Sequence, residues 1–177
     1  TDFPMKANLA QNEPARIAAW KSAGIYQKMM ARPAPKGKFV LPDGPPYANG
    51  FLHVGHALNK ILKDIVIKYK NMAGYHAAFV PGWDCHGLPI ELNVTKKLGP
   101  KRKEMTDAEV RALCRQEALG WVEKQKSQFE RFGVLGDWEN PYLTLNPAYE
   151  ADEIRVLAKI FENGIFYRGE KPVYWCP

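Results

Sequence analysis

The chain has 177 residues, of which 46% are hydrophobic and 25% charged, and its formal net charge is +6. These values exclude a disordered or fibrous chain and are typical of a globular protein with a real core. No apolar run approaches the roughly 20 residues of a membrane-spanning helix, and three cysteines are too few for a disulfide framework. We therefore expect a cytoplasmic protein with no membrane association. The positive charge favours a polyanionic partner, although many enzymes are equally basic.

The first predicted elements are a helix and a short strand. Residues 14–30 start with a proline that suits a helix N-terminus and carry apolar side chains among polar ones, so they predict a helix. The proline- and glycine-rich segment 32–37 ends it, and 38–41 predict a short buried strand. This break separates an N-terminal helical extension, residues 1–37, from a second unit, residues 38–177.

A loop, a helix and another strand follow. Residues 43–50, DGPPYANG, predict a shaped loop, 56–73 a long helix and 75–80 a second buried strand. Apolar residues at helical spacing are predicted to face the core: Leu58, Ile61, Leu62, Ile65, Val66, Tyr69 and Met72. The lysines on the other faces are predicted to be solvated: Lys60, Lys63, Lys68 and Lys70. With strand 38–41 this is a βαβ unit, which predicts an α/β fold with a Rossmann-like, doubly wound parallel sheet.

Two later helices are predicted from their start signals. A capping box, TDAE, opens a helix over 106–133, and an Asn-Pro pair opens a helix over 146–163. Residues 165–167 and 173–175 are predicted to be short strands. Four aromatic side chains at helical or turn positions are expected in the core rather than at a ligand: Trp20, Trp121, Trp138 and Phe161.

The clearest chemistry lies in the segment HVGH, residues 53–56, between the loop and the long helix. A helix N-terminus exposes N–H groups and a partial positive charge, which suit a triphosphate. Gly55 lets a nucleotide approach the backbone, and the imidazoles of His53 and His56 can donate hydrogen bonds to phosphate oxygens. Such histidines are also common as surface or capping residues. They could belong to a metal site as well, although no third ligand has suitable local spacing.

Three blocks of the sequence resemble one family. DGPPYANG followed by HVGH resembles the first signature of the class I aminoacyl-tRNA synthetases, most closely their isoleucine members. PGWDCHGLPIE, residues 81–91, resembles a second block of these members, and residues 133–144 resemble a third. The resemblance covers nearly the whole chain. It identifies residues 38–177 as the first part of a Rossmann-like catalytic domain that ends near the expected start of an editing-domain insertion.

The resemblance also implies roles for individual residues. His53 and His56 match the histidines that contact the ATP phosphates and act in catalysis. The implied ATP site comprises His53, Gly55, His56 and Asn49. The implied amino-acid site comprises Gly44, Pro45, Pro46, Tyr47 and Asp84. Asp84 matches the acid that accepts the α-ammonium group, and its place beyond a predicted strand suits a ligand-binding edge. Helix capping is the alternative for this residue.

The chain departs from the family pattern at a few points. Pro42 stands where isoleucine members more often have histidine, and Val54 replaces an isoleucine. The second family signature, a Lys-Met-Ser-Lys-Ser loop, does not occur in this sequence. We therefore expect these 177 residues alone to bind nucleotide weakly and to activate an amino acid poorly. Cys176 matches the first cysteine of a zinc-binding pair in some members, so zinc is expected only in a longer protein.

The function implied by the resemblance is that of an isoleucine–tRNA ligase, of which these residues hold the HxGH half of the site. The carboxylate of L-isoleucine would attack the α-phosphorus of ATP and expel pyrophosphate with Mg²⁺. A ribose hydroxyl of tRNA(Ile) would then attack the adenylate. A monomeric parent protein is expected. Three alternatives stay open: a valine or leucine synthetase, a small nucleotidyltransferase, and a non-catalytic RNA-binding or assembly module with a synthetase-like shell.

Overall fold

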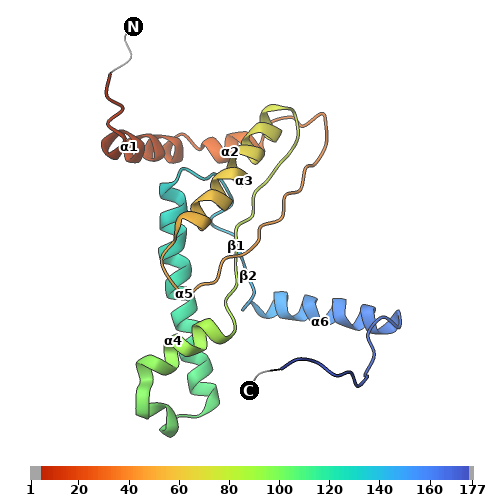
Figure 1. The fold of residues 1–177 in the computed structure, drawn as a ribbon. Coiled ribbons are helices and arrows are strands. Elements are labelled where there is room, and N and C mark those ends of the chain that lie inside the picture. The colour runs from red at the N-terminus through yellow and green to blue at the C-terminus, as the bar shows by residue number, and fades with distance from the viewer. Residues whose placement is uncertain (1–4, 176–177) are drawn as a thin grey trace.

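The structure, a computed structural model, describes residues 5–175 of the chain. A long helix, α5 (Asp107–Arg131), runs from top to bottom along one side of the molecule in the view of Figure 1. The helices α1 (Leu9–Ser22) and α2 (Ile25–Met30) lie near its C-terminal end, and α4 (Leu88–Leu98) packs against its N-terminal half. The helix α6 (Pro147–Glu162) projects to one side. Among the described residues, no helix is long and apolar enough to cross a membrane.

The N-terminal helix differs from its prediction in two respects. It begins at Leu9 rather than at Pro14, which lies inside α1, because nothing between these residues breaks a helix. It is also divided, since a turn at residues 23–24 separates α1 from α2. An ion pair of 2.8 Å between Glu13 and Arg131 joins α1 to the end of α5.

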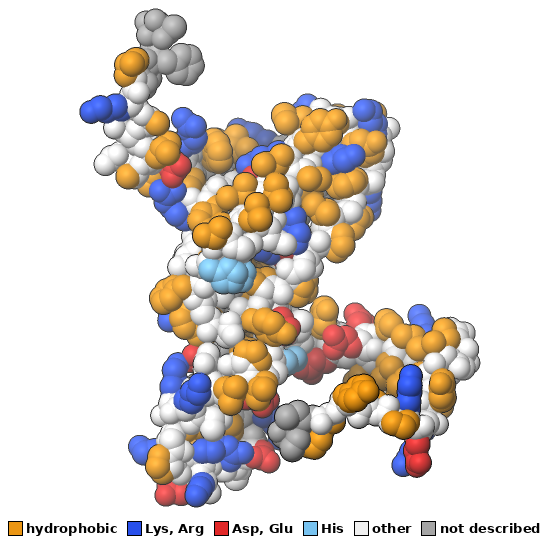
Figure 2. All heavy atoms as spheres, in the orientation of Figure 1, with side chains coloured by type: hydrophobic (Ala, Val, Ile, Leu, Met, Phe, Trp, Pro, Cys, Tyr) orange, Lys and Arg blue, Asp and Glu red, His pale blue; other side chains and the backbone are white. Residues whose placement is uncertain are grey.

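Helix α3 (Val54–Met72) confirms the predicted long helix, but the face it buries is not the predicted one. The buried residues are Lys60, Asp64, Ile67 and Asn71, which also recur at helical spacing. The face predicted to be the core is exposed: Ile61, for example, is 40% exposed and Ile65 is 56% exposed. Figure 2 shows hydrophobic side chains gathered over this helix. The prediction that the lysines of α3 are solvated is therefore wrong for Lys60, which is 2% exposed.

The sheet is parallel, as predicted, but much smaller. Strand β1 (Gly82–Trp83) pairs in parallel with β2 (Tyr142–Leu143), and their first residues lie opposite each other. The predicted strands 38–41 and 75–80 meet at an isolated parallel bridge rather than along a ladder. The chain between them forms α3, so the βαβ connection is present with its strands reduced to extended segments.

The long helix α5 confirms its predicted start. Thr106 accepts a hydrogen bond from the N–H of Glu109, whose carboxylate accepts one from the N–H of Thr106, which is the predicted capping box. Before this helix, α4 and a 3₁₀ helix, η1 (Gly99–Glu104), fill a region for which no element was predicted. Both α4 and α5 contribute apolar residues to the main cluster of buried residues, together with the extended segment 77–85.

The end of the chain departs most from the prediction. Helix α6 has its predicted start and end, but the segments 165–167 and 173–175 form no strand and are exposed. A strand needs a neighbouring strand for its N–H and C=O groups, and no part of the described chain pairs with these segments. The expected core position of Phe161 is also wrong, because this side chain is 62% exposed. Trp138, at 7% exposed, is in the core as predicted, and Trp20 and Trp121 are half-buried.

Candidate functional site

The predicted histidine pair lies at the N-terminus of α3 and caps it. Nδ1 of His53 accepts a hydrogen bond from the N–H of Gly55 at 3.1 Å, and the N–H of His53 donates to Nδ1 of His56 at 3.2 Å. The two ring centroids are 3.9 Å apart. Since Nδ1 of each ring is an acceptor, the proton of each neutral ring lies on Nε2. Capping the helix therefore leaves Nε2–H of both rings as the donor for a ligand.

The protonation of His56 suits a hydrogen-bond donor rather than a fixed charge. Burial lowers the pKa of His56 below its ordinary value of 6.5, and the electrostatic interactions with His53 and Lys60 lower it further. The ring is therefore mainly neutral at pH 7. Within the described residues, no group of three histidine, cysteine, aspartate or glutamate side chains is placed to hold a metal ion.

The loop 43–50 and Asp84 lie side by side, as their predicted common role requires. Tyr47 and Asp84 form an isolated parallel bridge. The N–H of Ala48 donates to the backbone oxygen of Asp84, and the N–H of Asp84 donates to that of Pro46, each at 2.9 Å. Asp84 does not cap α4, whose N-cap residue is Gly87. The side chain of Tyr47 is 50% exposed beside this bridge.

The other predicted site residues have varied environments. Gly44 is exposed and Pro45 is half-buried at the start of the loop. The backbone oxygen of Asn49 accepts a hydrogen bond of 3.3 Å from the side chain of Asn93 on α4. At Gly55, an added Cβ would lie 2.9 Å from the ring of His53, so the capping arrangement itself requires a glycine.

Gln125, which the sequence did not single out, links the loop 47–50 to Trp83, the neighbour of Asp84. Its side chain, 1% exposed on α5, donates to the backbone oxygens of Tyr47 at 3.0 Å and Gly50 at 2.7 Å. Its oxygen accepts a hydrogen bond of 2.9 Å from the indole of Trp83. It thus joins both ends of the segment 47–50 to the residue that precedes Asp84. A glutamine inside a long helix has no sequence signature that would single it out.

Asp43 is a second residue that was missed. Its buried carboxylate accepts hydrogen bonds from Lys60, from Lys63 at 2.8 Å and from the N–H of Gly82 at 3.1 Å. Its backbone oxygen accepts a hydrogen bond of 2.7 Å from the hydroxyl of Tyr142. Burial, the charge of Asp43 and the neighbouring Tyr149 raise the pKa of Tyr142 to about 12, so this hydroxyl keeps its proton at neutral pH.

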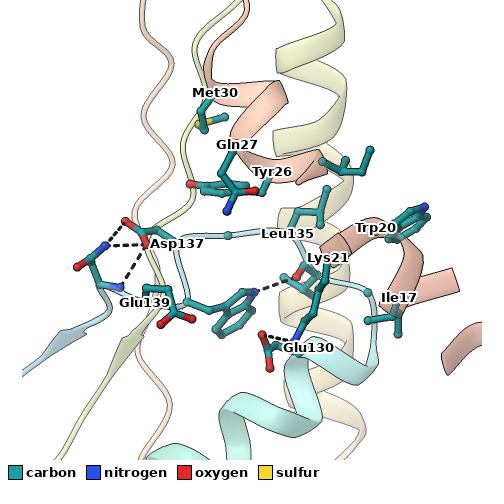
Figure 3. A pocket seen from close by; sticks show the side chains of 16 residues that line it. Ile17, Trp20, Lys21, Tyr26, Gln27, Met30, Glu130, Leu135, Asp137 and Glu139 are labelled. Atoms are coloured by element: carbon teal, nitrogen blue, oxygen red, sulfur yellow. Dashed lines mark hydrogen bonds and ion pairs between the residues drawn. The ribbon is translucent and has the colours of Figure 1, made fainter. Parts of the chain in front are cut away.

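A separate cavity of about 470 Å³ lies between the N-terminal helices and residues 130–140. Figure 3 shows Ile17 and Trp20 on one side of it, with the ion pair of Lys21 and Glu130 beside them. None of the predicted site residues lines this cavity. The predicted zinc ligand Cys176 lies outside the described residues.

Class I tRNA synthetases are the class that this fold and site define. A sequence profile of the class I tRNA synthetases for I, L, M and V matches residues 15–177. The chain therefore belongs to this family.

Two of its curated relatives have one name within this family. The isoleucine–tRNA ligases of Thermoanaerobacter sp. (strain X514) and Geobacter sulfurreducens are each 56% identical to it, over 100% and 99% of the chain. In both cases the chain covers only 19% of the relative's length.

The fold has a counterpart among solved structures. The crystal structure of the ternary complex LeuRS–tRNA–LeuAMS from Agrobacterium radiobacter K84 matches 92% of the chain with a TM-score of 0.67. The sequence identity is 21% and the match covers 19% of that chain. This likeness shows that the chain has the fold of part of a class I synthetase, an α/β fold in which the small parallel sheet is one component.

Proposed function

We propose that this chain is part of an isoleucine–tRNA ligase and holds the HxGH half of its active site. The observation that carries the proposal is the paired cap at the start of α3, where Nε2–H of His53 and His56 remains as a donor. The 56% identity to isoleucine–tRNA ligases supports isoleucine over valine or leucine as the amino acid.

In this proposal, the N-terminus of α3 binds the phosphates of ATP. Two imidazole N–H donors and the exposed N–H groups of the first turn would stabilise the negative charge that develops on the phosphates as pyrophosphate leaves. A neutral His56 already carries the Nε2–H donor, so it can donate this hydrogen bond without first gaining a proton. Mg²⁺ would enter bound to the phosphate oxygens of ATP and would neutralise part of their charge.

The amino-acid half of the proposal rests on the bridge between Tyr47 and Asp84. The carboxylate of Asp84 would accept the α-ammonium group of isoleucine, and Gly44, Pro45, Pro46 and Tyr47 would form one wall of the pocket. No covalent intermediate with the protein is required, so the rate would depend on how the two substrates are positioned and on electrostatic stabilisation. The adenylate formed would then be the acyl donor to tRNA(Ile).

The proposal is tested by isoleucine-dependent exchange of pyrophosphate into ATP. The assay uses a full-length protein that carries these residues and has the length of its curated relatives, with valine and leucine as comparison substrates. We expect exchange that prefers isoleucine and falls at least about a hundredfold in Asp84→Ala and His56→Ala. The exposed variant Lys103→Ala, on η1, is the control and should retain the wild-type rate. A folded protein without exchange would instead favour the non-catalytic RNA-binding module.

A further inference from the structure

The buried charges around Asp43 connect all the segments that carry the proposed site. The carboxylate side chain is 0% exposed, and the side chains of Lys60 and Lys63 are 3% and 16% exposed. Asp43, Lys60 and Gly82 each lie within four residues of a proposed ligand-binding residue. Asp43 precedes Gly44, Lys60 follows His56 by one helical turn, and Gly82 stands two residues before Asp84.

We infer that Asp43 is a positioning residue, which holds the amino-acid loop and Asp84 at a fixed place relative to the helix that carries the ATP histidines. This inference rests on the proposed function. One oxygen of the carboxylate accepts from α3 through Lys63, and the other accepts from both Lys60 and the N–H of Gly82. Movement of the loop, the helix or strand β1 alone would break at least one of these bonds.

Stability alone is a weak reason for such a cluster. Taking a carboxylate and an ammonium group out of water costs several kcal/mol per ion, and well-packed apolar residues often replace a buried ion pair without loss of stability. What charged hydrogen bonds add is direction, because each donor fixes the position of the oxygen that accepts it. The ammonium group of Lys60 is further enclosed by the rings of Phe79 and Phe129, at 5.5 and 5.1 Å from their centroids, so it has little freedom to move.

Helix α3 offers a matched control. Lys68 pairs with Asp64 on the same helix and donates to the backbone oxygen of Gly133, and Asp64 accepts from the N–H of Leu135 at 2.9 Å. This second lysine–aspartate cluster also joins α3 to a neighbouring segment, but that segment carries none of the proposed ligand-binding residues. Lys68→Met therefore removes a lysine–aspartate contact of the same helix, although a more exposed one, without touching the connection between loop, helix and Asp84.

The experiment measures kcat and the KM values for isoleucine and ATP in the exchange reaction of the full-length protein, with thermal unfolding of each variant. For Asp43→Asn, which keeps the shape and one oxygen acceptor, we expect kcat to fall by about tenfold to a hundredfold while the KM for ATP changes by less than about threefold. Lys68→Met should lower the unfolding temperature at an unchanged kcat.

The double variant Asp43→Asn/Lys60→Met removes both charges, so it is the variant to examine if Asp43→Asn does not fold. Because this variant also lacks the charged contacts that hold the loop to α3, its kcat should fall by about the same tenfold to hundredfold expected for Asp43→Asn. Suppose that the wild-type protein shows exchange and that the folded double variant has a kcat within about twofold of the wild-type value. This result would overturn the inference and leave the proposed function standing. If the wild-type protein shows no exchange, it is the proposed function that fails, and the inference fails with it.

Discussion

At the scale of single residues, Gly82 makes the closest approach among the glycines of the described chain, to the ring of Tyr142. An added Cβ at Gly82 would lie 2.0 Å from the ring of Tyr142, the opposite residue in the pairing of β1 with β2. We expect Gly82→Ala to destabilise the chain by about 1–3 kcal/mol or more, because the ring must leave its place and its hydrogen bond to Asp43.

Chemical denaturation of the two alanine variants Gly82→Ala and Gly120→Ala measures this effect. Gly120 lies inside α5, and an added Cβ there meets nothing within 4 Å. Its replacement should stabilise the helix by about 1 kcal/mol, since alanine is the better helix former. Equal effects of the two substitutions would show that the close approach at Gly82 is relieved at no cost.

The titration of His56 is a second prediction at this scale. We expect a midpoint below pH 6.5, the ordinary value, with burial as the main cause and the electrostatic interactions with His53 and Lys60 as further causes. A lowered pKa means that the folded chain binds the proton more weakly than the unfolded chain does. The resulting contribution to stability is complete above pH 6.5 and is lost as the pH falls through the folded-state value.

Nuclear magnetic resonance of the histidine rings measures this midpoint, and His56→Gln assigns the signal. In Lys60→Met the pKa of His56 should rise, since a positive charge is removed and the carboxylate of Asp43 loses one partner. An unchanged midpoint in this variant would mean that Lys60 and His56 do not interact electrostatically.

The sequence identified some site residues and missed others for a physical reason. His53, His56 and Asp84 lie in loops or at a helix start, where a polar residue in a glycine-rich segment suggests a ligand. Asp43, Lys60 and Gln125 act through contacts between segments distant in sequence, such as the 78 residues between Gln125 and Tyr47. Such contacts have no local signal, so a lysine on a helix is read as solvated until its partner is known.

At the scale of elements, the two faces of α3 give opposite predictions. Ile67 is 0% exposed, whereas Leu62 on the face predicted to be the core is 54% exposed. In this chain, Ile67→Ala should cost about 2–5 kcal/mol and Leu62→Lys less than about 0.5 kcal/mol. The same lysine should reduce binding of a hydrophobic dye, because it interrupts the exposed apolar face of α3.

Denaturation of both variants at several protein concentrations measures the difference. If Leu62→Lys proved as destabilising as Ile67→Ala, the apolar periodicity of the sequence would have identified the buried face of the isolated chain after all. Both faces follow helical spacing, which explains why the pattern predicts the helix well and its orientation poorly. Apolar periodicity shows which side chains would gain from burial. It does not show which of two faces of the helix this part of the chain covers.

Local signals explain which other elements were predictable. The capping box at Thr106 and the Asn-Pro pair before α6 each mark a helix start within the helix's own sequence. Strands depend on partners elsewhere in the chain, so the apolar segments 38–41 and 75–80 could be recognised as extended without showing how little of a ladder they form. Helix α4 begins with Leu88 and Pro89 after Gly87, and no side chain caps its start, so its sequence lacks the signal that marks α5.

At the scale of the whole molecule, a few ion pairs and one aromatic side chain attach the N-terminal helices to the rest of the chain. Two ion pairs make this connection, Glu13 with Arg131 and Lys21 with Glu130, and three of their four side chains are at least 45% exposed. Trp20 adds an aromatic contact. Its ring lies 3.5 Å from where a Cβ of Gly133 would be, and the ammonium group of Lys68 is 5.4 Å from the centroid of the indole ring.

We expect the aromatic contact to matter more than the ion pairs. Exposed ion pairs contribute at most about 1 kcal/mol each and are screened by salt, whereas removal of a half-buried tryptophan costs about 2 kcal/mol or more. Limited proteolysis at the turn of residues 23–24 should therefore accelerate strongly in Trp20→Ala and only slightly in Glu13→Gln/Lys21→Met. High salt should accelerate cleavage of the wild-type chain by no more than the two substitutions Glu13→Gln and Lys21→Met do. The opposite ranking would show that the charges, rather than the wall of the cavity in Figure 3 that Trp20 supplies, hold these helices in place.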